Sequence, residues 1–144
     1  MSSQGEQKLF SFKILDNLHS KIIETLIDNI PEYVYIKDKE LKFLKINPKT
    51  AEALGLKNPN EAIGKSDFDF LPKDQANQAY EDDVKVLKTG QPIINKMERI
   101  TDADCNDHWF SVTKVPRYNS DSEIIGTIGI SRDVTDWMIQ QQQG

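Results

Sequence analysis

The sequence contains one cysteine, two histidines and no long apolar run. Cys105 alone forms no internal disulfide, and nothing in its polar surroundings indicates an oxidising compartment. One cysteine and two histidines that lie far from each other, His19 and His108, do not supply the roughly four ligands of a structural zinc site. No stretch approaches the ~18 apolar residues of a membrane span, and the polar start MSSQGEQKLF has no cleavage signal. We therefore expect a cytoplasmic chain, or a cytoplasmic piece of a larger one.

Basic residues are fewer than acidic ones, 18 against 23. The 144 residues carry a formal net charge of -5, with 28% charged and 38% hydrophobic residues, which is ordinary for a globular protein. No basic patch with interleaved aromatic residues is present, so the sequence predicts neither nucleic acid nor an anionic membrane surface as a partner. The length suits one domain with a substantial core.

The first 30 residues contain a helical pattern. Residues 1–8 are polar and are expected to be disordered, whereas apolar residues recur at spacings of three and four from Leu9 to Ile30. This spacing predicts an amphipathic helix, which Pro31 ends. The helix either packs on its own domain or pairs with its copy in a homodimer. The stripe is too short to establish a coiled coil, and its candidate dimer residues are Leu15, Leu18, Ile22 and Leu26.

From residue 31 onward the pattern alternates between strands and short helices. Strands are predicted at 33–38, 41–46, 93–101, 108–116 and 123–132, with tight turns that imply antiparallel pairing. Between the second and third strands, Asn47-Pro48, Asn58-Pro59 and Ser66 are helix-start signals. The clearest helix is 72–90, with Gly90 as its C-terminal stop. We expect the helices to cover one face of the sheet, and residues 137–144 to be a tail or the start of a further helix.

Acidic residues occur in two groups that could indicate a metal site or acid–base chemistry. Glu81, Asp82 and Asp83 are consecutive on the long predicted helix, where they fan out around the axis, so we expect a solvated face rather than a metal site. Asp67 and Asp69 resemble a carboxylate pair for acid–base chemistry. Their place in the first turn of a helix accounts for them equally, because acids there are favoured by the helix dipole.

Three stretches in their order resemble a PAS domain: YIKDKELKFLKINPKTAEALG, IGKSDFDFLP and HWFSVTKVPRYNSDSEIIGTIGISRDVTD. The last ends in the Asp-x-Thr pattern of the family, here Asp133 and Thr135. The resemblance covers about residues 25–136. One departure is Ser122, which follows Asp121 in the final turn where the family usually has glycine; only the turn geometry is affected.

The resemblance implies an α+β PAS fold at 31–136: a five-stranded antiparallel sheet, helices on one face and a flanking N-terminal helix. It also implies a sensory or relay module of a larger signalling protein, of the histidine kinase or diguanylate cyclase type. An effector domain, absent from these residues, would carry any kinase or cyclase activity. We therefore expect no catalytic residues in the module itself.

The resemblance also places one strand face toward the helices. By alternation, Phe110, Val112 and Lys114 share this inner face, and so do Thr127, Gly129 and Ser131. Such a wall either lines a small-molecule pocket or fills an ordinary core. The candidate pocket residues are Tyr35, Phe43, Phe70, Tyr80, Val84, Phe110, Val112, Thr127 and Ser131. The opposite face, with Met97, Trp109 and Ile130, is apolar enough to be covered by the N-terminal helix or a second subunit.

The sequence disfavours two cofactors that PAS domains bind, and leaves any other ligand unknown. Haem-binding relatives usually supply a histidine from the long helix, and residues 73–89 contain none. Flavin-binding photoreceptor relatives need a reactive cysteine after an asparagine in a helical motif, and Cys105 lies in another segment. No metal is expected.

The last strand ends in a polar joint, Arg132, Asp133 and Thr135. Asp133 or Thr135 can cap an exiting helix by accepting hydrogen bonds from its free N–H groups, and Arg132 can pair with a nearby acid. The joint is either a plain helix cap or a signal-transmission element whose hydrogen bonds differ between two states.

Two alternatives to a ligand-responsive sensor remain open. One is a pure dimerisation or interaction domain that binds no ligand. The other is a small α+β enzyme that uses the central cavity. An enzyme would need a nucleophile–base pair or a buried acid, and the two histidines are poorly placed for this.

Overall fold

The computed structural model describes residues 3–101 and 104–143, and it divides the chain into two compact units, Met1–Pro31 and Glu32–Gly144. The first unit is the helix α1 (Gln4–Asn29). The expectation of disorder up to residue 8 is wrong for the described part, because Ser3 caps α1 in a reciprocal capping box. The Ser3 Oγ accepts from the Glu6 N–H, and the Glu6 carboxylate accepts from the Ser3 N–H, each at 3.2 Å.

The sheet of the second unit is antiparallel and has the strand order β2-β1-β5-β4-β3. Its strands are β1 (Tyr33–Asp38), β2 (Phe43–Ile46), β3 (Ile93–Thr101), β4 (Asp107–Tyr118) and β5 (Ile124–Asp133). The last strand of the chain therefore lies in the centre, hydrogen-bonded to both β1 and β4. The predicted five-stranded antiparallel sheet with helices is confirmed.

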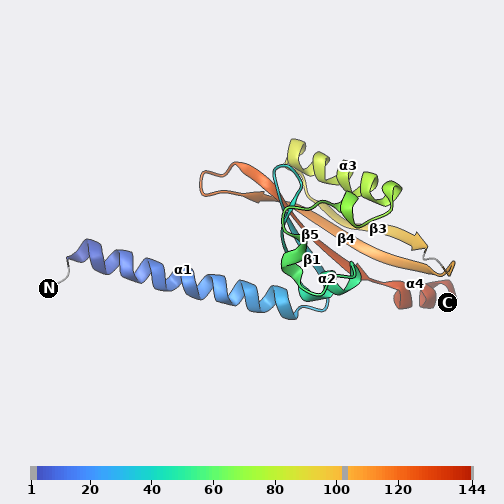
Figure 1. Ribbon diagram of the computed structural model, residues 1–144, viewed down its shortest axis with the longest axis horizontal. Helices are drawn as coiled ribbons and strands as arrows, with labels where there is room; N and C mark the ends of the chain where they lie inside the picture. Colours follow the sequence, from blue (N-terminus) through green and yellow to red (C-terminus); the bar gives the residue numbers. More distant parts are fainter. Residues whose placement is uncertain (1–2, 102–103, 144) are drawn as a thin grey trace. The chain divides into compact units, whose positions relative to one another are not determined.

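Helical segments between β2 and β3 pack on this sheet (Figure 1). They are α2 (Pro48–Ala53), two 3-10 helices at Pro59–Ala62 and Asp67–Asp69, and α3 (Lys73–Thr89). Asn47 begins α2, and its buried side chain also ties the helix to β1. The Asn47 Oδ1 accepts from the N–H groups of Thr50 and Val34, each at 3.1 Å. Gly90, at φ 69°, ends α3 in the left-handed conformation that favours glycine.

The loop between β1 and β2 is longer than the sequence predicts. The Asp38 carboxylate accepts from the N–H groups of Glu40 and Lys42, each at 2.9 Å, and Leu41 adopts φ 62°. This local turn uses residues that the alternating pattern assigned to the second strand. β2 therefore begins at Phe43 rather than at residue 41.

The hydrophobic core lies under α2 and the first 3-10 helix. It consists of Phe43, Ile46, Ala51 and Ala62, with Tyr35, Leu54, Leu56 and Phe70 packed against it. Ala76, Val86 and Val112 are buried as well, between α3 and the sheet. Beside these packed residues lies a cavity with polar and aromatic walls.

Candidate functional site

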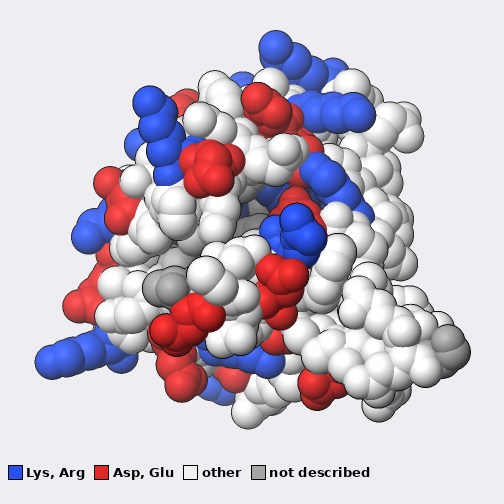
Figure 2. Space-filling model, turned by 90° about the vertical axis from the view of Figure 1, so that its right-hand side faces the viewer, with Lys and Arg blue, Asp and Glu red and all other residues white. Residues whose placement is uncertain are grey.

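The candidate site is a cavity of about 560 Å³ between the helices and the inner face of the sheet. All five strands contribute to its wall, as do α2, α3 and the segment before α3. Its volume lies within the range of roughly 300–1,000 Å³ typical of small-molecule sites. Figure 2 shows one face of the molecule hollowed near its centre, with both basic and acidic side chains around the hollow.

Five of the nine predicted pocket residues line this cavity: Tyr35, Phe43, Phe110, Val112 and Ser131. The inner face expected from strand alternation is therefore the face that lines the cavity. Whether these residues bind a ligand remains a prediction.

The other four predicted pocket residues lie elsewhere. Phe70 packs on Phe43 in the core, with ring centroids 6.1 Å apart, and Thr127 is 1% exposed on β5. Val84 is half-buried on α3, and Tyr80 is 48% exposed, where its ring meets Phe68 edge-on. None of the four lines the cavity.

The inward face of α3 is acidic, which corrects the expectation of a solvated acidic cluster. The buried residues of α3 are Ala76, Asp82, Asp83 and Val86. Helical spacing of three, four and seven gathers these residues on one side, whereas Tyr80 is 48% exposed and contacts Phe68. Asp82 and Asp83 can be buried because they form ion pairs with lysines of the sheet.

Lys37 on β1 lies at the centre of these contacts. Its ammonium donates to Asp67 Oδ2 at 2.5 Å and to Asp83 Oδ2 at 2.6 Å, and both Lys37 and Asp83 are 1% exposed. Burial lowers the pKa of Lys37, but the charges of Asp83 and Asp67 outweigh burial and raise the pKa overall. Lys37 therefore connects both α3 and the preceding 3-10 helix to the sheet. Asp67, expected only as an acid in the first turn of a helix, also forms an ion pair with Lys37.

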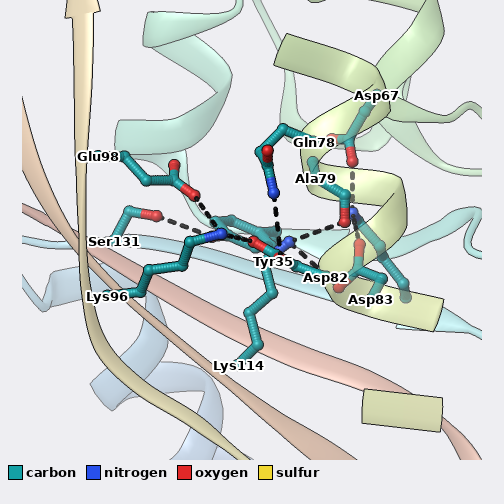
Figure 3. Close-up of polar contacts among 11 residues, drawn as sticks. Tyr35, Asp67, Gln78, Ala79, Asp82, Asp83, Lys96, Glu98, Lys114 and Ser131 are labelled. Atoms are coloured by element: carbon teal, nitrogen blue, oxygen red, sulfur yellow. Dashed lines mark hydrogen bonds and ion pairs between the residues drawn. The ribbon is translucent and has the colours of Figure 1, made fainter. Parts of the chain in front are cut away.

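Two further lysines extend the cluster along the cavity wall (Figure 3). The Lys114 ammonium on β4 donates to the Ala79 carbonyl at 3.2 Å and lies 3.3 Å from Asp83 Oδ1. The Lys96 ammonium on β3 donates to Asp82 Oδ2 at 2.7 Å and lies 4.0 Å from Glu98 Oε1. We call Lys37, Lys96 and Lys114 with Asp67, Asp82, Asp83 and Glu98 the buried charge cluster.

Glu98 makes the longest ion pair of the cluster, 4.0 Å to Lys96. Burial raises its pKa, and the nearby Asp82 adds to this, while the charges of Lys114 and Lys96 act in the opposite direction. Glu98 lines the cavity together with Lys37, Lys96, Lys114 and Asp67, whereas Asp82 and Asp83 lie behind this wall. The cavity thus has a charged wall and, around Tyr33, Leu54 and Phe110, an apolar one.

Tyr35 crosses the cavity floor next to this charged wall. Its hydroxyl shares a 2.7 Å hydrogen bond with Ser131 Oγ, which connects β1 to β5 (Figure 3). Burial raises the pKa of the Tyr35 hydroxyl, so it stays protonated at neutral pH and can donate a hydrogen bond. The Tyr35 ring lies against the backbone of Gly129, which has no side chain to obstruct it.

The predicted joint connects β5, β4 and α4 (Thr135–Gln143). The Asp133 Oδ1 accepts from the Thr135 N–H at 2.9 Å and from the Thr135 hydroxyl at 2.6 Å. The Thr135 Oγ1 in turn accepts from the Trp109 N–H at 2.9 Å, and the Trp109 carbonyl accepts from Val134. Arg132 is exposed and lines a groove on the outer face with Met97, His108 and Trp137. A signalling role for this joint remains a prediction.

In the first unit, the four predicted dimer residues form part of an apolar stripe. Leu15, Leu18, Ile22 and Leu26 are each between 51% and 61% exposed. The described helices include none that is long and apolar enough to cross a membrane. Across residues 3–101 and 104–143, no group of three or more His, Cys, Asp or Glu residues is placed to hold a metal ion.

Sequence reasoning placed Lys114 on the inner face but missed its partners, and it missed Lys37 and Lys96. It expected Asp82 and Asp83 to be solvated, whereas both are buried. Alternation does place Lys37 on the face of Tyr33 and Tyr35, and Lys114 on the face of Phe110 and Val112. A charged residue at an inner position is a usable signal, because lysine is almost never fully buried without a partner. The spacing of Ala76, Asp83 and Val86 carries the matching signal on α3.

Comparisons with known proteins identify the class of this fold and site. A family model described as PAS fold matches residues 27–137. A diguanylate cyclase of Vibrio cholerae is 26% identical over 132 residues, 91% of this chain and 41% of the relative. The methanogenesis regulatory histidine kinase FilI of Methanothrix harundinacea is 27% identical over 133 residues, 86% of this chain and 15% of the relative.

Among solved structures, the Vibrio cholera VqmA–ligand–DNA complex is similar, with a TM-score of 0.69 and 26% identity. The match covers 83% of this chain and 57% of that one. The chain therefore belongs to the PAS family, whose domains are sensory modules of signalling proteins. It spans less than half the length of the two curated relatives described above.

Proposed function

We propose that this chain is the ligand-sensing module of a larger signalling protein and that the signal is a small molecule held in the 560 Å³ cavity. The observation that carries the proposal is the cavity itself, whose apolar wall faces a charged one. A plain structural core would fill this space with side chains, since protein interiors are close-packed. The similar VqmA structure is a complex that includes a ligand, which supports a ligand-binding role for this fold.

In this proposal the module itself catalyses no reaction and acts within the cytoplasm. An effector domain of the histidine kinase or diguanylate cyclase type carries the output, as in the two curated relatives. The excess of acidic over basic residues supports a module that does not itself bind nucleic acid or a membrane surface. DNA in the VqmA complex is a property of that protein, of which the match covers 57%.

The two flanking helices complete the proposal. The exposed apolar stripe on α1 favours pairing with a second copy, because contiguous apolar surface of this kind marks an interaction site. α4 begins at the joint, where Thr135 connects it to β4. A change in the sheet would then reach α4 through Trp109 and Asp133. The domain limits in this scheme are 31–136 for the sensor, with 1–30 and 137–144 as flanks.

Mass spectrometry of the purified chain tests the ligand proposal. The mass under native conditions is compared with the mass after denaturation, and a loss on denaturation gives the mass of a bound molecule. The matched variants are Ser131→Phe, which fills the cavity, and Ile130→Phe, which lies on the opposite face and is 37% exposed. We expect the bound mass to disappear in Ser131→Phe and persist in Ile130→Phe. A bound mass that both variants retain would place the ligand elsewhere.

The exposed stripe also supports a second candidate function, a dimerisation domain without a ligand. This candidate predicts a native dimer whose mass contains nothing besides two chains. Such a result, together with an unchanged dimer in Ser131→Phe, would favour it over the sensor.

A further inference from the structure

Lys37, Lys96, Lys114, Asp67 and Glu98 of the buried charge cluster line the cavity. We propose that the ligand is an uncharged small molecule with a hydrogen-bond acceptor, such as a carboxamide or a carbonyl, beside an aromatic or apolar body. This inference rests on the proposed function of the cavity and adds the chemical class of its ligand.

Every charge of the cluster already lies near a charge of opposite sign before a ligand enters. The cluster has three ammonium groups, on Lys37, Lys96 and Lys114, against four carboxylates, on Asp67, Asp82, Asp83 and Glu98. Two more charged residues line the cavity, Arg99 and Asp74, but they are exposed and of opposite sign, so the excess of one carboxylate remains. No lysine of the cluster is without a nearby carboxylate, and no carboxylate is without a nearby lysine.

A charged ligand of either sign would disturb these ion pairs. An anion placed at Lys114 and Lys96 would lie beside Glu98, with Asp82 and Asp83 just behind the lysines. A cation placed at Glu98 or Asp67 would lie beside the same lysines. Lys37, Asp83 and Lys114 are almost fully buried, and beside buried charges both repulsions are stronger than in water. An unpaired buried charge is also costly. An uncharged molecule avoids both.

Hydrogen-bonding capacity remains for such a molecule. An ammonium has three donors. For Lys114 the described partners are the Ala79 carbonyl and Asp83 Oδ1, and the contact to Asp83 is an ion pair without hydrogen-bond geometry. A donor of Lys114 is therefore left for an acceptor in the cavity. Glu98, Ser131 and Tyr35 line the same wall and supply groups for a neighbouring N–H or O–H of the ligand.

The body of the ligand has a matching apolar surface. Tyr33 and Phe110 meet edge-on at the other side of the cavity, with ring centroids 5.9 Å apart, and Leu54, Leu71 and Ile100 line the space around them. An aromatic ring or a short apolar chain can pack there while its polar end contacts Lys114. The two walls thus set the orientation of the molecule as well as its charge.

Three probes of nearly the same shape separate the charge states: benzamide, benzoate and benzamidinium. Each is titrated at neutral pH into isotope-labelled protein, and binding is followed by the backbone amide signals of cavity residues such as Ser131 and Lys114. We expect benzamide to bind at least about tenfold more tightly than either charged probe. Where native mass spectrometry finds a molecule bound to the purified chain, the same inference requires that molecule to be uncharged.

Two variants shift the charge of the cluster in opposite directions. Glu98→Gln removes a carboxylate and should move the preference toward benzoate, whereas Lys96→Met removes an ammonium and should move it toward benzamidinium. Glu81→Gln, on the exposed side of α3, is the control and should leave the preference unchanged. A purely structural disturbance would not produce shifts of opposite sign.

The outcomes for this inference and for the proposed function are distinguishable. A charged probe that binds the cavity more tightly than benzamide, or a charged co-purified molecule, would overturn the uncharged class and leave ligand sensing intact. Preferences that do not respond to Glu98→Gln and Lys96→Met would also overturn it. If none of the probes perturbs the cavity signals and no molecule co-purifies, ligand sensing fails together with the inference.

Discussion

Tyr35 and Gly129 lie directly opposite each other in the pairing of β1 with β5, and the Tyr35 ring occupies the space where residue 129 would have a side chain. A Cβ added at position 129 would lie 1.9 Å from Tyr35 Cε2. The ring is therefore held across the sheet, where its hydroxyl meets Ser131. Gly129 therefore makes room for the Tyr35 ring at the cavity floor and is not required by a turn.

The first prediction concerns Gly129→Ala. The added methyl group forces the Tyr35 ring out of its position, and overpacking of this kind typically costs about 1–3 kcal/mol. We expect a lower free energy of unfolding in urea and altered amide signals for Tyr35 and Ser131. Gly5→Ala on α1, where the nearest atom is 3.8 Å from the added Cβ, is the control and should be neutral or slightly stabilising. A fully stable Gly129→Ala with unshifted signals would contradict the tight contact.

The second prediction concerns Lys37→Met. This change leaves Asp83 and Asp67 without their shared ammonium, and breaking a buried ion pair in this way costs about 3–5 kcal/mol. Denaturant unfolding measures the loss. Adding Asp83→Asn to Lys37→Met should recover part of it, since one unpaired buried charge is then removed. Lys39→Met, at an exposed position of the next turn, is the control, and a loss of equal size there would refute the assignment.

The third prediction is a pH dependence. The pKa of Lys37 is raised above its ordinary value of 10.5. The folded state therefore binds this proton more tightly than the unfolded state, and the stabilisation is fully present below pH 10.5. It is lost as the pH rises through the raised pKa. The difference in unfolding free energy between the wild type and Lys37→Met should stay constant up to about pH 10.5 and shrink between that pH and the raised pKa. A difference that shrinks near neutrality would contradict the ion pair.

The fourth prediction concerns the joint. Thr135→Val keeps the shape of the side chain but removes the oxygen that accepts from the Trp109 N–H, at a cost of about 1 kcal/mol. We expect faster hydrogen exchange at the Trp109 amide and in the first turn of α4. Thr135→Ser retains the hydroxyl and should preserve the protection. Equal exchange rates in Thr135→Val and the wild type would show that this bond does not hold α4.

The fifth prediction concerns α1. Leu18→Asp or Ile22→Asp places a charge on the exposed apolar stripe and should convert a dimer into a monomer in sedimentation experiments. Asn17→Asp adds the same charge at an exposed position outside the four dimer residues and is the control. A wild-type chain that sediments as a monomer, or a dimer that survives both changes, would remove α1 from the dimer contact.

Periodicity predicted most of the fold because each pattern is local. The starts of α2 and α3, the five strands and the inner position of Phe110 and Val112 follow from caps and alternation. The resemblance to PAS domains supplied the sheet and its helices, which local patterns only suggested. The start of α1 was missed because Ser3 and Glu6 form a capping box within a segment that composition alone describes as polar.

The charged half of the site could not be predicted from residue types alone. Asp83 and Lys37 are 46 residues apart in sequence, and each is an ordinary surface residue by type. Only the tertiary contact between α3 and the sheet makes them partners and permits their burial. For the same reason Tyr80 was assigned to the cavity: an apolar aromatic residue was favoured over an aspartate for the inward face of α3.

The most direct test of ligand sensing is a crystal structure of the purified chain, because it shows what occupies the cavity. We predict density for one small molecule with its polar end at Lys114 and its body against Phe110, while Lys37 remains bound to Asp67 and Asp83. A cavity closed by the side chains of Tyr33 and Phe110, or filled with ordered water throughout, in a chain whose native mass contains no ligand would contradict ligand sensing.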